Sequence, residues 1–252
     1  MLLVFYVASR SMVKMNEGKL KREKGIMIVA VDGPAGSGKS SICALVCEKL
    51  GWNYINTGFL YRTVGVILRK RAIPLDDIET VLIVVDEIAE NLIWNPDTSK
   101  VNFHGEDITP LLETSEAGQD ASMVAKMPAV REKLLPLQRD LTRKSSRNSI
   151  VDGRDIGTVV FPDADLKIFM TASLEERARR RFAQLKSATV DSDSVDLQVI
   201  QDDIVRRDHQ DAGRGTAPLM QADDAVLFDT SSMNVVSAVD SLIDILRSKH
   251  LI

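Results

Sequence analysis

A glycine-rich segment near residue 35 carries the most specific chemical pattern in the chain. Gly33 is followed after four residues by Gly38, Lys39 and Ser40, which is the spacing of a phosphate-binding loop. In such a loop, backbone N–H groups and a helix N-terminus bind phosphate oxygens, a lysine reaches the β- and γ-phosphates, and a hydroxyl ligates Mg²⁺. The pattern predicts that ATP or a similar nucleotide is bound, with Mg²⁺ on Ser40, by the run Gly33, Pro34, Ala35, Gly36, Ser37, Gly38, Lys39, Ser40 and Ser41.

The loop alone does not say how the triphosphate is used. A GTPase that reads guanine needs an Asn-Lys-x-Asp tetrapeptide, which is absent, and motor or transporter ATPases are usually longer than 252 residues. A small-molecule kinase fits the length and requires a second anion site. Arginines beside predicted turns or strand ends are candidates for it, although a solvated surface position is the alternative for any one of them: Arg62, Arg131, Arg154, Arg207 and Arg214.

Composition narrows the class of protein further. The 32 basic and 36 acidic residues give a net charge of −4, which argues against a dedicated nucleic-acid binder but leaves a locally basic cleft open. Cys43 and Cys47 are too few for a disulfide framework and indicate a reducing compartment. Three scattered histidines predict no zinc site. We expect a cytoplasmic protein without membrane or nucleic-acid partners, and we predict a monomer.

The elements that must position the loop alternate between strands and helices. Short apolar runs predict buried strands at 26–31, 149–152 and 166–170, a last strand at 225–228, and a hairpin over 91–103. Helical patterns cover 41–50, 58–70, 76–90, 111–126, 128–144, 174–186, 196–210 and 235–246. This alternation predicts an α/β fold with a parallel, doubly wound sheet. Residues 186–195 are predicted to be mobile, and residues 1–25 to be a poorly ordered extension, with a targeting signal as the alternative.

Five blocks, in order, resemble the bacterial cytidylate kinase family. They are Asp32–Lys39, the Asn56-Thr57-Gly58-x-x-Tyr61-Arg62 segment, Asp152–Ala164, Arg207–Leu219 and Ala225–Thr230. The block from Asp152, Asp-Gly-Arg-Asp-Ile-Gly-Thr-Val-Val-Phe-Pro-Asp-Ala, is the most specific. The resemblance spans about 27–246 and implies a P-loop NTPase fold that transfers the γ-phosphoryl group of ATP to CMP and dCMP.

The resemblance also implies a domain organisation and a role for individual residues. A kinase domain at 26–252 would have its core at 26–74 and 129–252, a monophosphate-binding insert at about 75–128 and a lid at about 186–214. The acceptor phosphate would be held by Thr57, Arg62, Arg154 and Arg214. The cytosine edge would be read by Ser122, Arg131 and Asp155, and the sugar hydroxyls by Arg207 and Asp211. Asn56 stands where the family commonly has Asp, and Phe59 replaces a smaller residue, so we expect altered packing there.

A basic cluster in the predicted helix 174–186 adds catalytic candidates. Arg177, Arg180 and Arg181 share one helix face at spacings of three and four. The resemblance implies that this region faces the transferring phosphates, which makes these arginines catalytic candidates beside Lys39. Pairing with nearby acids such as Glu176 is the alternative. Two other functions stay open: a kinase of the same fold with UMP or another small acceptor, and a nonenzymatic nucleotide sensor.

Overall fold

The computed structural model describes residues 26–95, 98–143, 145–188 and 196–252. The chain divides into two compact units. We call Met27–Asn56 together with Asn148–Ile252 the core unit, and Thr57–Arg147 the second unit. The predicted N-terminal extension and most of the segment predicted to be mobile lie outside the described residues. None of the helices in the described part of the chain is long and apolar enough to cross a membrane.

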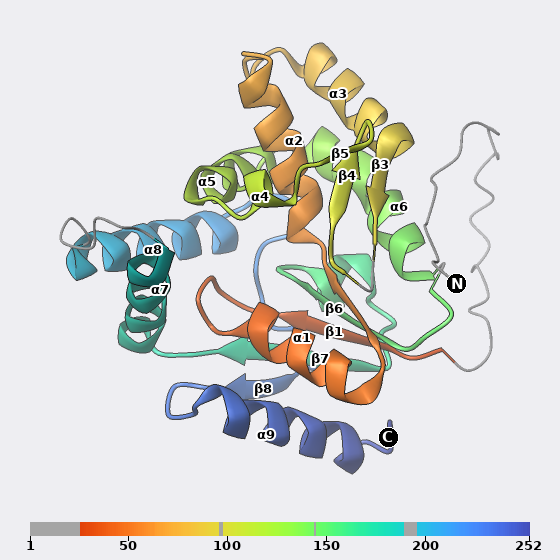
Figure 1. The fold of residues 1–252 in the computed structure, drawn as a ribbon. Helices are drawn as coiled ribbons and strands as arrows, with labels where there is room; N and C mark the ends of the chain where they lie inside the picture. The colour runs from red at the N-terminus through yellow and green to blue at the C-terminus, as the bar shows by residue number, and fades with distance from the viewer. Residues whose placement is uncertain (1–25, 96–97, 144, 189–195) are drawn as a thin grey trace. The chain divides into compact units, whose positions relative to one another are not determined.

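The core unit is built on a five-stranded sheet of order β2-β6-β1-β7-β8 (Figure 1). Its neighbouring strands all run parallel, which confirms the predicted doubly wound α/β fold. β1 is central and buried along its whole length, as its continuously apolar sequence predicts. The strands are β1 (Ile28–Asp32), β2 (Asn53–Asn56), β6 (Ser149–Gly153), β7 (Leu166–Thr171) and β8 (Val226–Asp229).

Two helices pack against this sheet to form the main hydrophobic core. α1 (Lys39–Leu50) and α9 (Val235–Ser248) lie together in Figure 1, and their apolar faces meet side chains of β1 and β7. Val46 and Leu242 in this cluster are fully buried. α7 (Leu174–Ala188) and α8 (Leu197–Ala212) pack on each other through a smaller apolar cluster. The carboxyl ends of β1 and β6 lie level with each other, and the phosphate-binding loop connects the end of β1 to the start of α1.

The second unit combines helices with a small antiparallel sheet of order β3-β4-β5. The predicted hairpin over 91–103 is confirmed by the pairing of Leu92 with Phe103. The elements of this unit are α2 (Gly58–Lys70), α3 (Ile78–Asn91), β3 (Leu92–Trp94), β4 (Val101–Phe103), β5 (Glu106–Asp107), α4 (Thr109–Leu112), α5 (Ser115–Val124) and α6 (Pro128–Arg143).

Three local features differ from the sequence prediction. Strand β2 was missed, because two of its four residues are asparagines and its pairing with β6 supplies what propensity does not. The predicted helix 111–126 is divided, because the Thr114 side chain accepts a hydrogen bond from the N–H of Ala117 and starts a new helix, α5. Residues Ile156–Val160, inside the most specific sequence block, form a short π-helix.

Candidate active site

The phosphate-binding loop between β1 and α1 has the backbone that its glycines permit. Gly33 and Gly38 have φ of 148° and 90°, values that residues with a side chain rarely adopt. A Cβ atom on Gly33 would also lie 1.9 Å from the carbonyl oxygen of Met170 on β7. Gly38 is the N-cap of α1, so the loop leads directly into a twelve-residue helix whose N-terminal N–H groups can bind an anion.

Lys39 is folded onto its own loop. Its ammonium donates hydrogen bonds to the carbonyl oxygens of Gly33 and Pro34, each at 2.8 Å, and to the Ser37 hydroxyl at 3.3 Å. Burial, followed by the positive charge of Arg154, lowers the pKa of Lys39 to about 8. The lysine is thus held beside the loop. A bound anion would stabilise the charge of the ammonium and could replace the loop oxygens as acceptors of its hydrogen bonds.

Ser40 lies in a hydroxyl–carboxylate network that the sequence reasoning did not identify as part of the site. The Ser40 hydroxyl donates to Asp152 Oδ2 at 2.9 Å, and the Tyr54 hydroxyl donates to the same oxygen at 2.9 Å. Asp152 is the penultimate residue of strand β6 and is buried. The sequence did contain a signal for this residue, because Asp152 is a carboxylate at the end of the predicted strand 149–152. Asn56, the departure noted above, also approaches this network, with its amide nitrogen 3.5 Å from Ser40 Oγ.

The donor set of this network suits Mg²⁺. A hydroxyl oxygen and a carboxylate oxygen are hard ligands, and Mg²⁺ in nucleotide enzymes is commonly held by one or two protein oxygens together with phosphates and waters. Within the described residues no group of three or more His, Cys, Asp or Glu side chains could hold a metal by itself. Ser40 and Asp152 therefore fit a metal that arrives with a triphosphate.

Asp211 on α8 joins two of the predicted phosphate-binding arginines. Its Oδ2 accepts from Arg154 Nε at 2.9 Å, and its Oδ1 accepts from an Nη of Arg214. The Asp211 and Arg214 side chains are each only 7% exposed. Burial by itself would lower the pKa of Arg154, but Asp211 and Asp152 outweigh it and leave that pKa above its ordinary value. The cluster is a preformed pair of guanidinium groups held by one carboxylate.

Asp155 follows Arg154 and precedes the π-helix. Asp155 is 5% exposed, and its backbone carbonyl oxygen accepts hydrogen bonds from the N–H groups of Val159 and Val160. The aspartate is thus held on a short, buried turn at the carboxyl end of β6. A buried carboxylate of this kind can read the hydrogen-bonding edge of a base.

Arg177 and Arg180 on α7 bind the back of the phosphate loop through its carbonyl groups. Arg177 Nη1 donates to the carbonyl of Ala35 at 3.3 Å and to Asp208 Oδ2 at 2.7 Å. Arg180 Nη1 donates to the carbonyl of Ser37 at 3.1 Å, and its Nε donates to Glu176 at 2.7 Å. Both arginines therefore donate to carbonyl groups of the loop, and Arg180 also pairs with an acid of its own helix.

Arg181 and Arg207 approach each other from α7 and α8. Burial, and then the positive charge of Arg207, lowers the pKa of Arg181. Arg181 also donates to Gln184 at 2.8 Å, while Arg207 pairs with Asp203 at 3.0 Å. The positive charge of Arg207 is thus unfavourable for the Arg181 guanidinium, and a bound anion would offset it.

The second unit contains the remaining predicted residues on three of its helices. Thr57 is the buried N-cap residue of α2, and Arg62 on the same helix donates to the carbonyl of Leu112 at 2.5 Å. The Ser122 hydroxyl on α5 donates to the carbonyl of Gly118 at 3.0 Å. Arg131 on α6 is 7% exposed.

Aromatic side chains of the second unit contact some of these residues and their neighbours. The Arg131 guanidinium carbon lies 5.4 Å from the centroid of the Tyr61 ring, a cation–π contact. Phe59 stacks on Trp94 with ring centroids 6.1 Å apart. The larger Phe59 is therefore accommodated by stacking, which agrees with the altered packing expected at this position.

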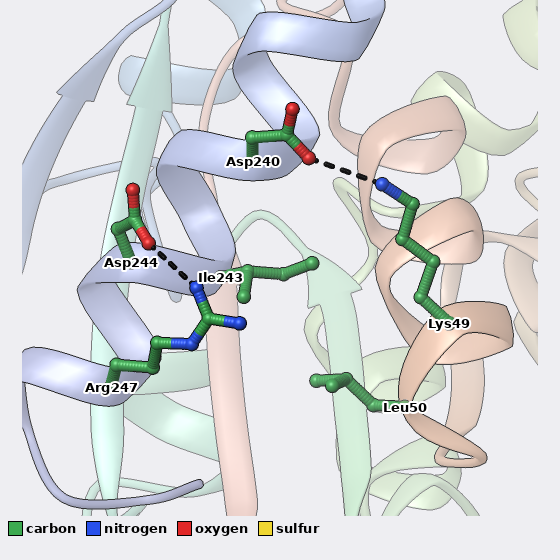
Figure 2. Close-up of a pocket in the computed structure, with 6 residues that line it drawn as sticks. All are labelled: Lys49, Leu50, Asp240, Ile243, Asp244 and Arg247. Carbon is green, nitrogen blue, oxygen red and sulfur yellow. Dashed lines mark hydrogen bonds and ion pairs between the residues drawn. The ribbon is translucent and has the colours of Figure 1, made fainter.

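A shallow cavity of about 490 Å³ in the core unit is separate from these groups. Figure 2 shows it between α1 and α9, with Lys49 paired to Asp240 at 3.1 Å and Arg247 paired to Asp244 at 3.0 Å. Lys49 stands near the C-terminal end of α1, whereas the phosphate loop stands at its N-terminal end. Exposed ion pairs line this depression, and none of the predicted site residues does.

Comparison with known proteins shows which family this chain resembles. The family model described as cytidylate kinase matches residues 29–248. A protein named cytidylate kinase from Pseudomonas paraeruginosa is 39% identical over 220 residues, covering 86% of this chain and 94% of the relative. One of the same name from Thermotoga maritima is 38% identical over 221 residues, covering 88% and 97%. An uncharacterized protein from Eubacterium ventriosum is similar in fold, with a TM-score of 0.50, 12% identity, and coverage of 88% of this chain and 98% of that one.

Proposed function

The chain belongs to the cytidylate kinase family, and on that premise we propose which residues carry out its reaction. As a phosphotransferase of this family it phosphorylates CMP with ATP as the donor. The single observation that carries our site assignment is the cluster of Arg154, Asp211 and Arg214 in the same unit as the phosphate loop. A kinase for a phosphorylated acceptor needs two anion sites, and the core unit contains the elements of both.

The donor side is assigned to the phosphate loop. We propose that backbone N–H groups of residues 35–41 bind the β- and γ-phosphates and that Lys39 turns from its own loop carbonyls toward them. Ser40 and Asp152 would hold Mg²⁺, which neutralises charge on the phosphates when it is bound. Arg177 and Arg180 are positioned to support the loop from behind, and Arg181 is the arginine we assign to the transferring phosphate.

The acceptor side is assigned to arginines. Arg154 and Arg214 would bind the CMP phosphate, since paired guanidinium groups match phosphate oxygens well, and Thr57 and Arg62 are proposed as further ligands. Asp211 would hold the first two in place, and Arg207 is the candidate for the sugar hydroxyls. No general base is needed, because the acceptor phosphate is already a nucleophilic oxyanion near neutral pH. The rate then depends on positioning and charge neutralisation.

The base is assigned to Asp155, Ser122 and Arg131. Cytosine presents an amino donor where uracil presents a carbonyl acceptor, so a buried carboxylate at Asp155 favours cytosine. We propose dCMP as a second acceptor and a monomer that acts on small molecules, not nucleic acid. A cytoplasmic location is proposed from the substrates and from the free thiols of Cys43 and Cys47.

A coupled assay of ADP release with CMP, dCMP, UMP and AMP tests these assignments. Wild type should prefer CMP to UMP in kcat/KM by at least about tenfold, the value of one charge-assisted hydrogen bond. Asp155→Ala should lose CMP activity far more than UMP activity. Equal use of UMP by wild type would favour a kinase with a different acceptor, and no ADP release with any acceptor would favour a nucleotide sensor.

A further inference from the structure

Asp32, the last residue of β1, makes a pair of hydrogen bonds that the assignments above leave unused. Its Oδ1 accepts from the N–H of Ile156 at 2.7 Å, and its Oδ2 accepts from the N–H of Gly157 at 2.7 Å. Asp32 is 5% exposed. A carboxylate with both oxygens bound to consecutive backbone amides fixes the position of that peptide segment closely.

The segment that Asp32 holds is the one that carries Arg154 and Asp155. In the parallel ladder, Asp32 stands level with Gly153, and the chain then passes through Arg154 and Asp155 to the two amides. The amides belong to the first residues of the π-helix, whose N–H groups have no partner inside the helix. Asp32 therefore closes the turn between Gly153 and Gly157 at the end of the sheet.

Gly157 is suited to this close approach. A Cβ atom there would lie 3.1 Å from Lys167 Cδ and 3.4 Å from Asp32 Oδ2, so the segment fits between the lysine stem and the carboxylate. Lys167 is in turn fixed by its ion pair with Asp224 at 2.9 Å. The turn is thus confined on both sides by side chains of adjacent strands, β1 and β7.

Burial is unfavourable for the charged form of this carboxylate. Burial raises the pKa of Asp32 to about 6, although the two backbone hydrogen bonds and Lys39 act in the opposite direction. Asp155 adds to the rise. Asparagine at this position would avoid the burial of charge, but its single oxygen cannot replace both acceptors.

We propose that Asp32 is a positioning residue for the acceptor site: it joins the start of the phosphate loop to the turn that presents Arg154 and Asp155 to the nucleoside monophosphate. Although Asp32 immediately precedes Gly33 in the loop, its side-chain oxygens bind Ile156 and Gly157, so its effect falls on the acceptor side. This inference rests on the proposed acceptor roles of Arg154 and Asp155.

The test compares Asp32→Asn with wild type and with Asp165→Asn in steady-state kinetics. Asp165 also accepts a backbone hydrogen bond, from Ile28 at the other end of β1 at 2.7 Å, and serves as the matched control. For Asp32→Asn we expect KM for CMP to rise at least about tenfold, with KM for ATP within about twofold of wild type. The control should leave both constants unchanged. Equal rises in both constants, or no rise for CMP in a folded variant, would overturn the proposal.

Amide hydrogen exchange, followed by NMR in the wild type, tests the contact without a variant and without CMP turnover. The amides of Ile156 and Gly157 should exchange at least about tenfold more slowly than exposed amides. Free exchange of both would contradict the bracing by Asp32 even if the kinase activity is as proposed. Slow exchange in an enzyme that does not use CMP would instead leave the contact intact and refute the acceptor assignment.

Discussion

Replacing Asp211 by asparagine tests the arginine cluster directly. The aspartate accepts from Arg154 and Arg214 with separate oxygens, whereas asparagine has only one accepting oxygen and would turn its amide toward the other guanidinium. Loss of one buried charge-assisted hydrogen bond amounts to about 1.5–3 kcal/mol. We therefore expect kcat/KM for CMP to fall roughly 10- to 150-fold, mainly through KM for CMP, while KM for ATP changes little.

The deoxy substrate distinguishes two roles for this carboxylate. If Asp211 acts by aligning the phosphate-binding arginines, the losses with CMP and dCMP should agree within about threefold, because both substrates carry the same phosphate. If it binds the 2′-hydroxyl of the sugar instead, the loss with CMP should be much the larger. Asp202→Asn is the matched control, since Asp202 lies exposed on the same helix and accepts only from Gln198 in the described contacts. A large excess loss with CMP, or unchanged kinetics, would refute the alignment role.

Three further outcomes are expected on the donor side. Lys39→Ala should lower kcat about 100- to 1000-fold with an unchanged circular dichroism spectrum, because a charge beside the transferring phosphate is lost; near-normal turnover would remove Lys39 from the mechanism. The pKa of Lys39 is about 8, so its charge is present below that pH and is lost above it. We therefore expect kcat/KM for ATP to fall about tenfold per pH unit above pH 8. A flat profile up to pH 10 would contradict this. Tyr54→Phe removes one donor to Asp152 and should weaken metal binding about tenfold, measured by Mn²⁺ electron paramagnetic resonance with a nonhydrolysable ATP analogue; unchanged Mn²⁺ affinity would separate Tyr54 from the metal site.

The sequence was sufficient for features encoded by local spacing. The Gly33–Ser40 pattern requires a strand before it and a helix after it, and β1 and α1 are both present. The apolar runs of β6 and β7 likewise predicted buried parallel strands. In these cases the backbone conformation and the burial are dictated by neighbouring residues in the chain.

Features that depend on long-range contacts could not be predicted in the same way. Asp152 joins Ser40 from 112 positions away, and Asp32 reaches Ile156 across 124 positions. Neither carboxylate has a spacing signature of its own. Their partners are set by the strand order, which places β6 beside β1. The arginines were recognisable by type as candidate phosphate ligands, but the contacts of Arg154 and Arg214 with Asp211 required the structure.

Phosphorus NMR of a reaction containing equal amounts of ATP and CMP tests the central claim most directly. Transfer of the γ-phosphoryl group to the acceptor predicts that the β-phosphorus signal of CDP grows one for one with ADP, with little inorganic phosphate. Asp211→Asn should slow both signals together, since it acts on the acceptor side of the same step. Inorganic phosphate accumulating in place of CDP, or ADP appearing at the same rate without CMP, would contradict the assignment of a CMP-directed phosphoryl transfer.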